Sequence, residues 1–391
     1  MISKFNWGYI FLKKNPFDLT PPVDSEQVIW AGMEGVKRQF DEIFKVAVSD
    51  SATQVVLNRG LYGGGKTHAA IYFASDKYLS SIPTSETPIH QINICAPKDP
   101  GKPAEDFYID ILDTLGMSYV HKIIRESVCQ LSEAEAMKLL QTVLGSEELA
   151  RAFWLFGTEN TGEKQALLRA YFLEGCTRTE LRKLGIARNI SKSQDRFRVL
   201  AGVLQCLIGL NPSQEKSQHS RVCLWVDEIE DLIYLTSSQF RIVTQGLRDL
   251  IDRLPNFFTL FLNMTLADPE AYEEFNVILG GALLDRITDV IYFPELDLNE
   301  AVEYVSELIN HPQYRDKSLL PEGLPETYPF DLTALEMLLE DLENKTPRNI
   351  NKRCRNAIYA AFSDGHFEIG KSIIDSAYVM KLEQIELDRE V

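Results

Sequence analysis

The spacing of apolar and polar positions predicts that short strands and helices alternate along most of the chain. Short apolar runs typical of strands occur at 53–57, 89–95, 222–226, 257–262 and 290–293. The third of these runs is apolar throughout, as expected of a central parallel strand that is buried on both faces. Amphipathic helical spacing separates the runs and continues after the last one. The pattern therefore predicts an α/β protein with a parallel five-stranded sheet.

The same pattern divides the 391 residues into three parts. Residues 1–34 are rich in aromatic residues and proline, 35–297 hold the α/β domain, and 298–391 form a C-terminal α-helical domain. Within the α/β domain, the stretch at about 118–210 is helical throughout and is predicted to be a large insertion. A chain of this length suits two or three domains.

The most informative motif follows the first strand, where residues 60–67 read G-L-Y-G-G-G-K-T and match G-x-x-x-x-G-K-[ST]. Glycines let backbone N–H groups surround a triphosphate, and the helix that follows favours an anion at its N-terminus. The motif predicts that Lys66 contacts the β- and γ-phosphates and that the Thr67 hydroxyl binds Mg²⁺. His68 is included in the site, although its simplest role is that of a helix residue. The residues assigned to the nucleotide here are Gly60, Tyr62, Gly63, Gly64, Gly65, Lys66, Thr67 and His68.

An acidic pair, Asp227 and Glu228, follows the buried strand 222–226. The carboxyl edge of a parallel sheet is where ligands bind in open α/β folds. In isolation the pair would be explained as a solvated strand end or a helix cap. Together with the phosphate loop it predicts that Asp227 holds Mg²⁺ through water and that Glu228 polarises the attacking water.

With both motifs present, the chain resembles the AAA+ ATPases, a P-loop NTPase family whose helical C-terminal domain is called the lid. This resemblance implies that ATP is the nucleotide and that the next strand carries a polar sensor. Asn263 is the first choice for the sensor and Thr265 the second. Residues 283–287, L-L-D-R-I, resemble the arginine-finger box, so Arg286 is expected to reach a neighbouring subunit. Compensation of a helix dipole is the alternative role for this arginine.

Two more segments extend the resemblance. Residues 345–348, K-T-P-R, are similar to the G-x-P-R motif of the third lid helix, with the family's glycine replaced, and make Arg348 the second sensor. In the N-terminal segment, residues 15–17, N-P-F, and 28–34, V-I-W-A-G-M-E, resemble the entry of origin-initiator and ExeA/TnsC-like ATPases. This resemblance implies that Phe17, Ile29 and Trp30 surround the adenine. Core packing explains these apolar residues equally well. The insertion loosely resembles BrxD-like ATPases of phage-defence loci through 171–175 and 181–186.

Charge and cysteine content limit the function classes. The net charge of −17 argues against a surface that grips DNA throughout. A local basic segment at 178–198 could contact phosphates, but a solvated helix face explains it slightly better. The six cysteines include no C-x-x-C pair, which argues against a zinc site and for a reduced, cytoplasmic protein. No signal peptide and no apolar run of membrane-spanning length is found.

The sequence leaves two functional hypotheses open. In the first, the chain is an Mg²⁺-dependent ATPase that assembles with itself into a ring or filament. It would then act with a protein partner on a nucleic-acid-associated complex, in DNA transactions or anti-phage defence. In the second, it is a nucleotide-gated switch that controls a partner effector protein without contacting DNA.

Overall fold

The computed structural model describes residues 6–22, 24–82, 88–210, 219–266, 277–367 and 373–390. The chain groups into two units. The first comprises Met1–Gln39, Gly60–Ser75 and Tyr292–Val391, and the second comprises Phe40–Arg59 and Asp76–Ile291. Each unit has its own buried apolar cluster. The division into 1–34, 35–297 and 298–391 stays a sequence-based prediction.

The strands form one parallel five-stranded sheet in the order β2-β3-β4-β1-β5, which confirms the predicted α/β class. Strand β3 lies between β2 and β4, and Cys95 at the end of β2 is the register partner of Asp227 at the end of β3. The apolar run at 222–226 is buried at every position, as its composition predicts. The strand bounds are β1 Gln54–Gly60, β2 Ile89–Cys95, β3 Arg221–Asp227, β4 Phe258–Thr265 and β5 Asp289–Phe293.

The two faces of β3 are covered by different kinds of side chain, because successive residues of a strand point to opposite faces. On one face, the Trp225 ring stacks on Phe261 with 3.7 Å between centroids, and Phe40 of helix α1 (Glu34–Ser49) packs beside both. The buried indole is satisfied because its N–H donates to Gln91 Oε1 at 2.7 Å. The alternate residues, such as Leu224, join the large core of the second unit, in which aliphatic side chains are mixed with phenylalanine and tyrosine.

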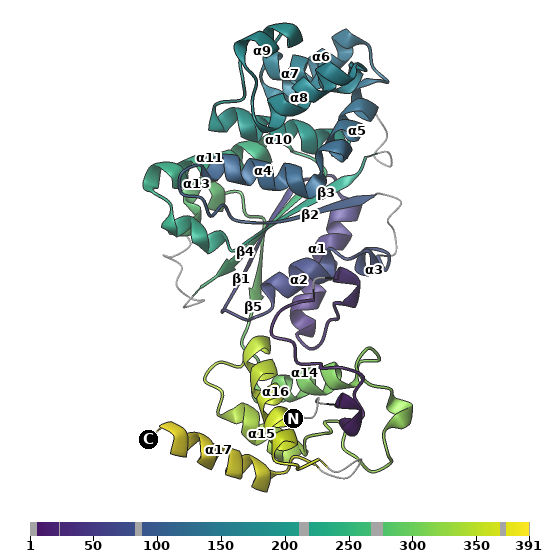
Figure 1. Ribbon diagram of the computed structural model, residues 1–391, viewed down its shortest axis with the longest axis vertical. Coiled ribbons are helices and arrows are strands. Elements are labelled where there is room, and N and C mark those ends of the chain that lie inside the picture. The colour runs from purple at the N-terminus through teal and green to yellow at the C-terminus, as the bar shows by residue number, and fades with distance from the viewer. Residues whose placement is uncertain are drawn as a thin grey trace. The chain divides into compact units, whose positions relative to one another are not determined.

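Three helices lie over this second face of the sheet. One of them, α10, is part of the predicted insertion at 118–210, and the other helices of the insertion stack on the three (Figure 1). These three are α4 (Pro103–Leu115), α10 (Ser193–Ile208) and α11 (Ser237–Arg253). Gly202 of α10 allows close packing, since a Cβ there would lie 2.6 Å from a methyl group of Leu144. The other helices of the insertion are α5 Met117–Val128, α6 Glu133–Leu144, α7 Glu147–Thr158, α8 Gly162–Leu173 and α9 Arg178–Leu184.

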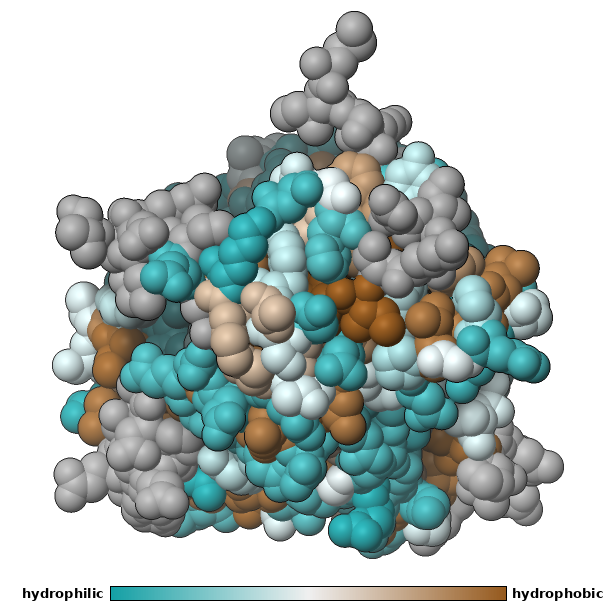
Figure 2. Space-filling view, turned by 90° about the horizontal axis from the view of Figure 1, so that it is seen from below, coloured by the Kyte–Doolittle hydropathy of each residue, from teal (hydrophilic) through white to brown (hydrophobic). Residues whose placement is uncertain are grey.

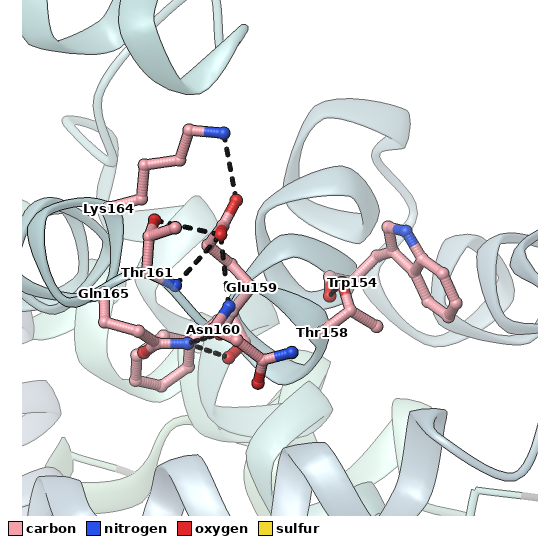
Figure 3. A network of polar contacts seen from close by, with 8 residues as sticks. Trp154, Thr158, Glu159, Asn160, Thr161, Lys164 and Gln165 are labelled. Carbon is pink, nitrogen blue, oxygen red and sulfur yellow. Dashed lines mark hydrogen bonds and ion pairs between the residues drawn. The ribbon is translucent and has the colours of Figure 1, made fainter.

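The turn between α7 and α8 is fixed by one carboxylate. Glu159 accepts hydrogen bonds from the backbone N–H groups of Asn160 and Thr161, both at 3.1 Å, and from the Thr161 hydroxyl at 3.0 Å (Figure 3). Lys164 Nζ lies 3.0 Å from the other carboxylate oxygen. These contacts, with Lys164 the largest, lower the pKa of Glu159 to about 2. The turn therefore holds a carboxylate that stays ionised well into the acid range.

The first unit contains the C-terminal helices and α2 (Lys66–Phe73). Its core includes side chains of the N-terminal segment, and Phe17 packs edge-on against Phe330 there. The face seen in Figure 2 is mostly hydrophilic, with small, separated apolar areas. The C-terminal helices are α14 Leu298–Asn310, α15 Leu332–Glu340, α16 Pro347–Ser363 and α17 Ser376–Glu390.

The remaining helical segments are short. Among those named within the described residues, α3 and α13 are single α-helical turns, and η1, η2, η4 and η5 are of the 3-10 type. Within the described part of the chain, we find no helix with the length and apolarity to cross a membrane. The short segments are α3 Asp76–Leu79, α13 Gly281–Leu284, η1 Trp7–Ile10, η2 Ser25–Gln27, η4 Ile229–Tyr234 and η5 Lys317–Leu319.

Candidate nucleotide site

The phosphate loop joins the end of β1 to the start of α2, as the motif predicts. Gly63 and Gly65 have φ values of +78° and +103°, a left-handed region that side chains disfavour. Gly60 is required for another reason, since a Cβ there would lie 2.6 Å from the Phe293 carbonyl oxygen. Gly65 is the residue before α2, and no side chain caps this helix. The glycines thus allow a tight loop that leads into a helix N-terminus.

Lys66 lies inside this loop and is only 5 % exposed. Its Nζ donates to the carbonyl oxygens of Gly60 and Leu61, each at 2.9 Å. Thr67 is exposed at the start of α2. The His68 ring points elsewhere, because its Nε2 lies 2.6 Å from the Ile29 carbonyl oxygen and burial lowers its pKa. The His68 ring therefore links α2 to the N-terminal segment by a hydrogen bond.

Arg348 meets the phosphate loop within the first unit. Its backbone N–H donates to the Gly63 carbonyl oxygen at 3.3 Å, and its guanidinium carbon lies 4.4 Å from the centroid of the Tyr62 ring. Two residues place it there: Thr346 caps the N-terminus of α16, and Pro347 occupies the first turn. The structure thus brings Arg348 to the loop, where the resemblance had led us to expect the second sensor.

The N-terminal aromatic residues are used for packing. Phe17 is completely buried, and Ile29 is 5 % exposed. The Trp30 ring lies against Tyr72 and Phe73 of α2, with centroids 5.4 and 5.1 Å apart. This placement favours the core-packing role that the sequence left open for Phe17.

In the second unit, the acidic pair lies at the end of β3. Asp227 Oδ1 accepts a hydrogen bond from the Glu228 N–H at 3.0 Å. Glu228 has φ 57° and ψ 38°, a left-handed conformation that costs a non-glycine residue roughly 1–2 kcal/mol. Strained backbone of this kind clusters at functional sites. The conformation therefore supports a functional role for Glu228 independently of its sequence context.

Glu228 has a partner that sequence reasoning missed. Lys98, which follows β2, places Nζ 2.6 Å from Glu228 Oε2. The hydrogen bond to this carboxylate, followed by its charge, raises the pKa of Lys98. The parallel register that sets Cys95 beside Asp227 explains the contact, because it brings the residues after both strands together. The contact between Lys98 and Glu228 could have been predicted only if the sequence had shown that β2 lies beside β3.

Asn263 is fully buried on β4 and is also fixed by a residue that the sequence did not single out. Its Oδ1 accepts a hydrogen bond from Asn58 Nδ2 of β1 at 2.8 Å. The alternative sensor, Thr265, donates its backbone N–H to Glu230 Oε2 at 2.9 Å. Asn263 thus contacts β1, the strand that leads into the phosphate loop, whereas the hydrogen bond of Thr265 joins it to Glu230.

The fold was compared with known proteins. No family model and no curated protein matches the chain. The ADP form of the Aeropyrum pernix ORC2 protein is 12 % identical, with a TM-score of 0.51 over 95 % of this chain and 72 % of that one. The same protein in ADPNP–ADP complexes is 11 % identical, with a TM-score of 0.51 over 92 % of this chain and 69 % of that one. The A. pernix ORC1 protein in complex with DNA is 13 % identical, with a TM-score of 0.49 over 97 % of this chain and 71 % of that one.

This chain has the AAA+ fold. Two observations identify the fold. The structure is similar to that of ORC2, and it has the strand order β2-β3-β4-β1-β5 followed by C-terminal helices. At this level of identity the comparison concerns the fold alone, so the role of each AAA+ motif residue rests on its own surroundings.

The arginine expected to act as the AAA+ finger, Arg286, is paired within its own unit. It follows α13 and lies against Asp252 of α11, with Nε to Oδ1 at 2.9 Å and Nη2 to Oδ2 at 3.3 Å. Asp252 also raises the pKa of Arg286, first through the hydrogen bond and then through its charge. A function in a neighbouring subunit stays a prediction.

The basic segment 178–198 is less positive than its sequence suggests. Buried Asp195 pairs with Arg188 at 3.4 Å and Arg198 at 3.3 Å, while Arg196 pairs with Glu105 and Lys183 with Glu163. Among the described residues, the members of this segment without an ion pair are Arg178, Arg182 and Lys192.

All six cysteines are free, and among the described residues no group of three His, Cys, Asp or Glu side chains could hold a metal ion.

Proposed function

We propose that this protein is an ATPase that converts ATP and water to ADP and phosphate. The observation that carries this proposal is the glycine-built loop of the first unit, which contains Lys66, is contacted by Arg348 and continues into the N-terminus of α2. Such a loop offers backbone N–H groups and two cations to a polyphosphate. The adenine nucleotides named in the ORC2 structures agree with the proposal.

The residues fit Mg²⁺ as well as the nucleotide. Mg²⁺ prefers oxygen ligands and commonly keeps water, and Thr67 with Asp227 supplies a hydroxyl and a carboxylate. The ion would neutralise charge on the phosphates. In the proposal, Glu228 orients and accepts a proton from the attacking water, and Asn263 donates to a phosphate oxygen.

We further propose that the ATPase assembles with itself and acts on a nucleic-acid-associated complex. Arg286 would complete a neighbouring site in the assembly after leaving Asp252. Arg178, Arg182 and Lys192 are the candidates for a DNA contact, because their charges are not offset by an ion pair. A place in DNA transactions or phage defence rests on the resemblance alone.

The second candidate is a nucleotide-gated switch that acts on a partner protein without DNA. The internal ion pairs of the 178–198 segment favour it, as does the net charge of −17. Both candidates use the same nucleotide site and differ in whether DNA contributes to assembly.

Two measurements test these proposals. Lys66→Ala should abolish ATP binding in calorimetry, with Lys77→Ala, an exposed lysine of α3, as the control. Retained binding would overturn the phosphate-loop assignment. Light scattering on Glu228→Gln, which should hold ATP without turnover, then reports assembly. A mass that grows with ATP alone supports self-assembly, growth only with duplex DNA supports action on nucleic acid, and a constant mass favours the switch.

A further inference from the structure

Tyr62 is the loop residue whose exposure needs an explanation. Its side chain is 72 % exposed, although a large aromatic ring is costly to leave in water. One side of the ring is covered by the Arg348 guanidinium at 4.4 Å. The residue after Tyr62 also contacts Arg348. The Arg348 backbone N–H donates to the Gly63 carbonyl oxygen, and the two residues are so close that a Cβ at Gly63 would lie 2.8 Å from the Arg348 Cβ.

The contact with the ring does not use the hydrogen-bond donors of Arg348. A guanidinium has five N–H donors, and a cation–π contact is an attraction between its charge and the face of the ring. Among the described residues, Arg348 forms no ion pair with a carboxylate, in contrast to Arg286. A cation held over an aromatic ring beside a phosphate loop, with no carboxylate partner among the described residues, can offer its N–H groups to an anion.

We propose that Tyr62 is a positioning residue, whose ring orients Arg348 toward the terminal phosphate of the bound nucleotide. The inference rests on the proposed ATPase function and adds to it a residue that acts through Arg348. A cation–π contact at an exposed site predicts about a two- to fivefold effect on affinity for a triphosphate. The effect on a diphosphate should be smaller, because the diphosphate lacks the group that Arg348 reaches.

The test is a double-mutant cycle in the full chain. Affinities for a non-hydrolysable ATP analogue and for ADP are measured by calorimetry for Tyr62→Leu, Arg348→Ala and the double variant. Tyr62→Leu should weaken binding of the analogue about two- to fivefold and should have no further effect once Arg348 is alanine. Tyr62→Phe, which keeps the aromatic face, should restore most of the lost affinity.

The chain offers a matched control. Arg355, also on α16, lies over the Tyr359 ring at 5.2 Å. Tyr359→Leu removes a similar contact on the same helix and should not change analogue affinity. Melting temperatures for all variants separate loss of folding from loss of positioning.

Two results would overturn the inference: unchanged affinity in Tyr62→Leu, or the same loss whether or not Arg348 is present. The second result would mean that Tyr62 touches the nucleotide itself or merely shapes the loop. Failure of the proposed function has a different signature, in which the unmodified protein binds neither nucleotide or Lys66→Ala binds both.

Discussion

Replacing Lys98 with methionine tests how Glu228 is controlled. The ion pair joins two exposed side chains, 61 % and 46 % accessible, so screening by water limits its strength to about 0.2–1 kcal/mol. If Glu228 must leave Lys98 before it can accept a proton from water, breaking the ion pair adds that free energy to the activation barrier. Removing Lys98 then lowers the barrier by the same amount. Turnover in Lys98→Met should therefore rise about 1.4- to fivefold, with ATP affinity unchanged.

The assay is steady-state phosphate release at saturating ATP. Lys102→Met is the matched control, since Lys102 lies in the same segment and pairs with Glu105 at 3.5 Å instead. The pKa of Lys98 is raised, so the lysine stays charged and the ratio of variant to wild type should hold from neutral to mildly alkaline pH. Added salt should reduce the ratio toward one. A fall in turnover would refute the reasoning, because Lys98 would then assist the reaction.

Three further predictions concern the architecture of the site and the insertion. Gly63→Ala places a Cβ 2.8 Å from Arg348 at a φ of +78°, so calorimetry should show at least about a tenfold loss of ATP affinity. Asn58→Ala removes the donor to buried Asn263, and urea unfolding should report a loss of about 1–3 kcal/mol. The depressed pKa of Glu159 means that its stabilising effect is present above about pH 4.5 and is lost as pH falls toward about 2. Glu159→Gln should thus melt lower than wild type at neutral pH and equally near pH 2.

The features that the sequence predicted correctly are those encoded locally or by repetition. The run at 222–226 is apolar at every position, and only a strand covered on both faces needs that composition. The phosphate loop depends on glycines that geometry requires at 60, 63 and 65. Pro347 marks the start of α16 because proline is favoured in the first turn of a helix.

The features that the sequence did not predict depend on contacts between distant residues. Lys98 and Glu228 are 130 positions apart, and Asn58 and Asn263 are 205 apart. Strand order determines both contacts, and no local pattern specifies that β1 lies beside β4 and β2 beside β3. Phe17 shows the same limit, since its apolar character fits a core and a base-binding pocket equally.

The charged residues expected at the nucleotide differ in how freely they can act. Lys66 is held by two carbonyl oxygens, Glu228 by Lys98 and Arg286 by Asp252, so each must exchange a protein partner for a new one. Arg348 lies against an aromatic face and can accept an anion on its N–H edge while keeping that contact. A phosphate that approaches the loop would therefore engage Arg348 without first breaking an ion pair. We therefore expect the Tyr62–Arg348 pair to respond most directly to whether the bound nucleotide is a triphosphate or a diphosphate.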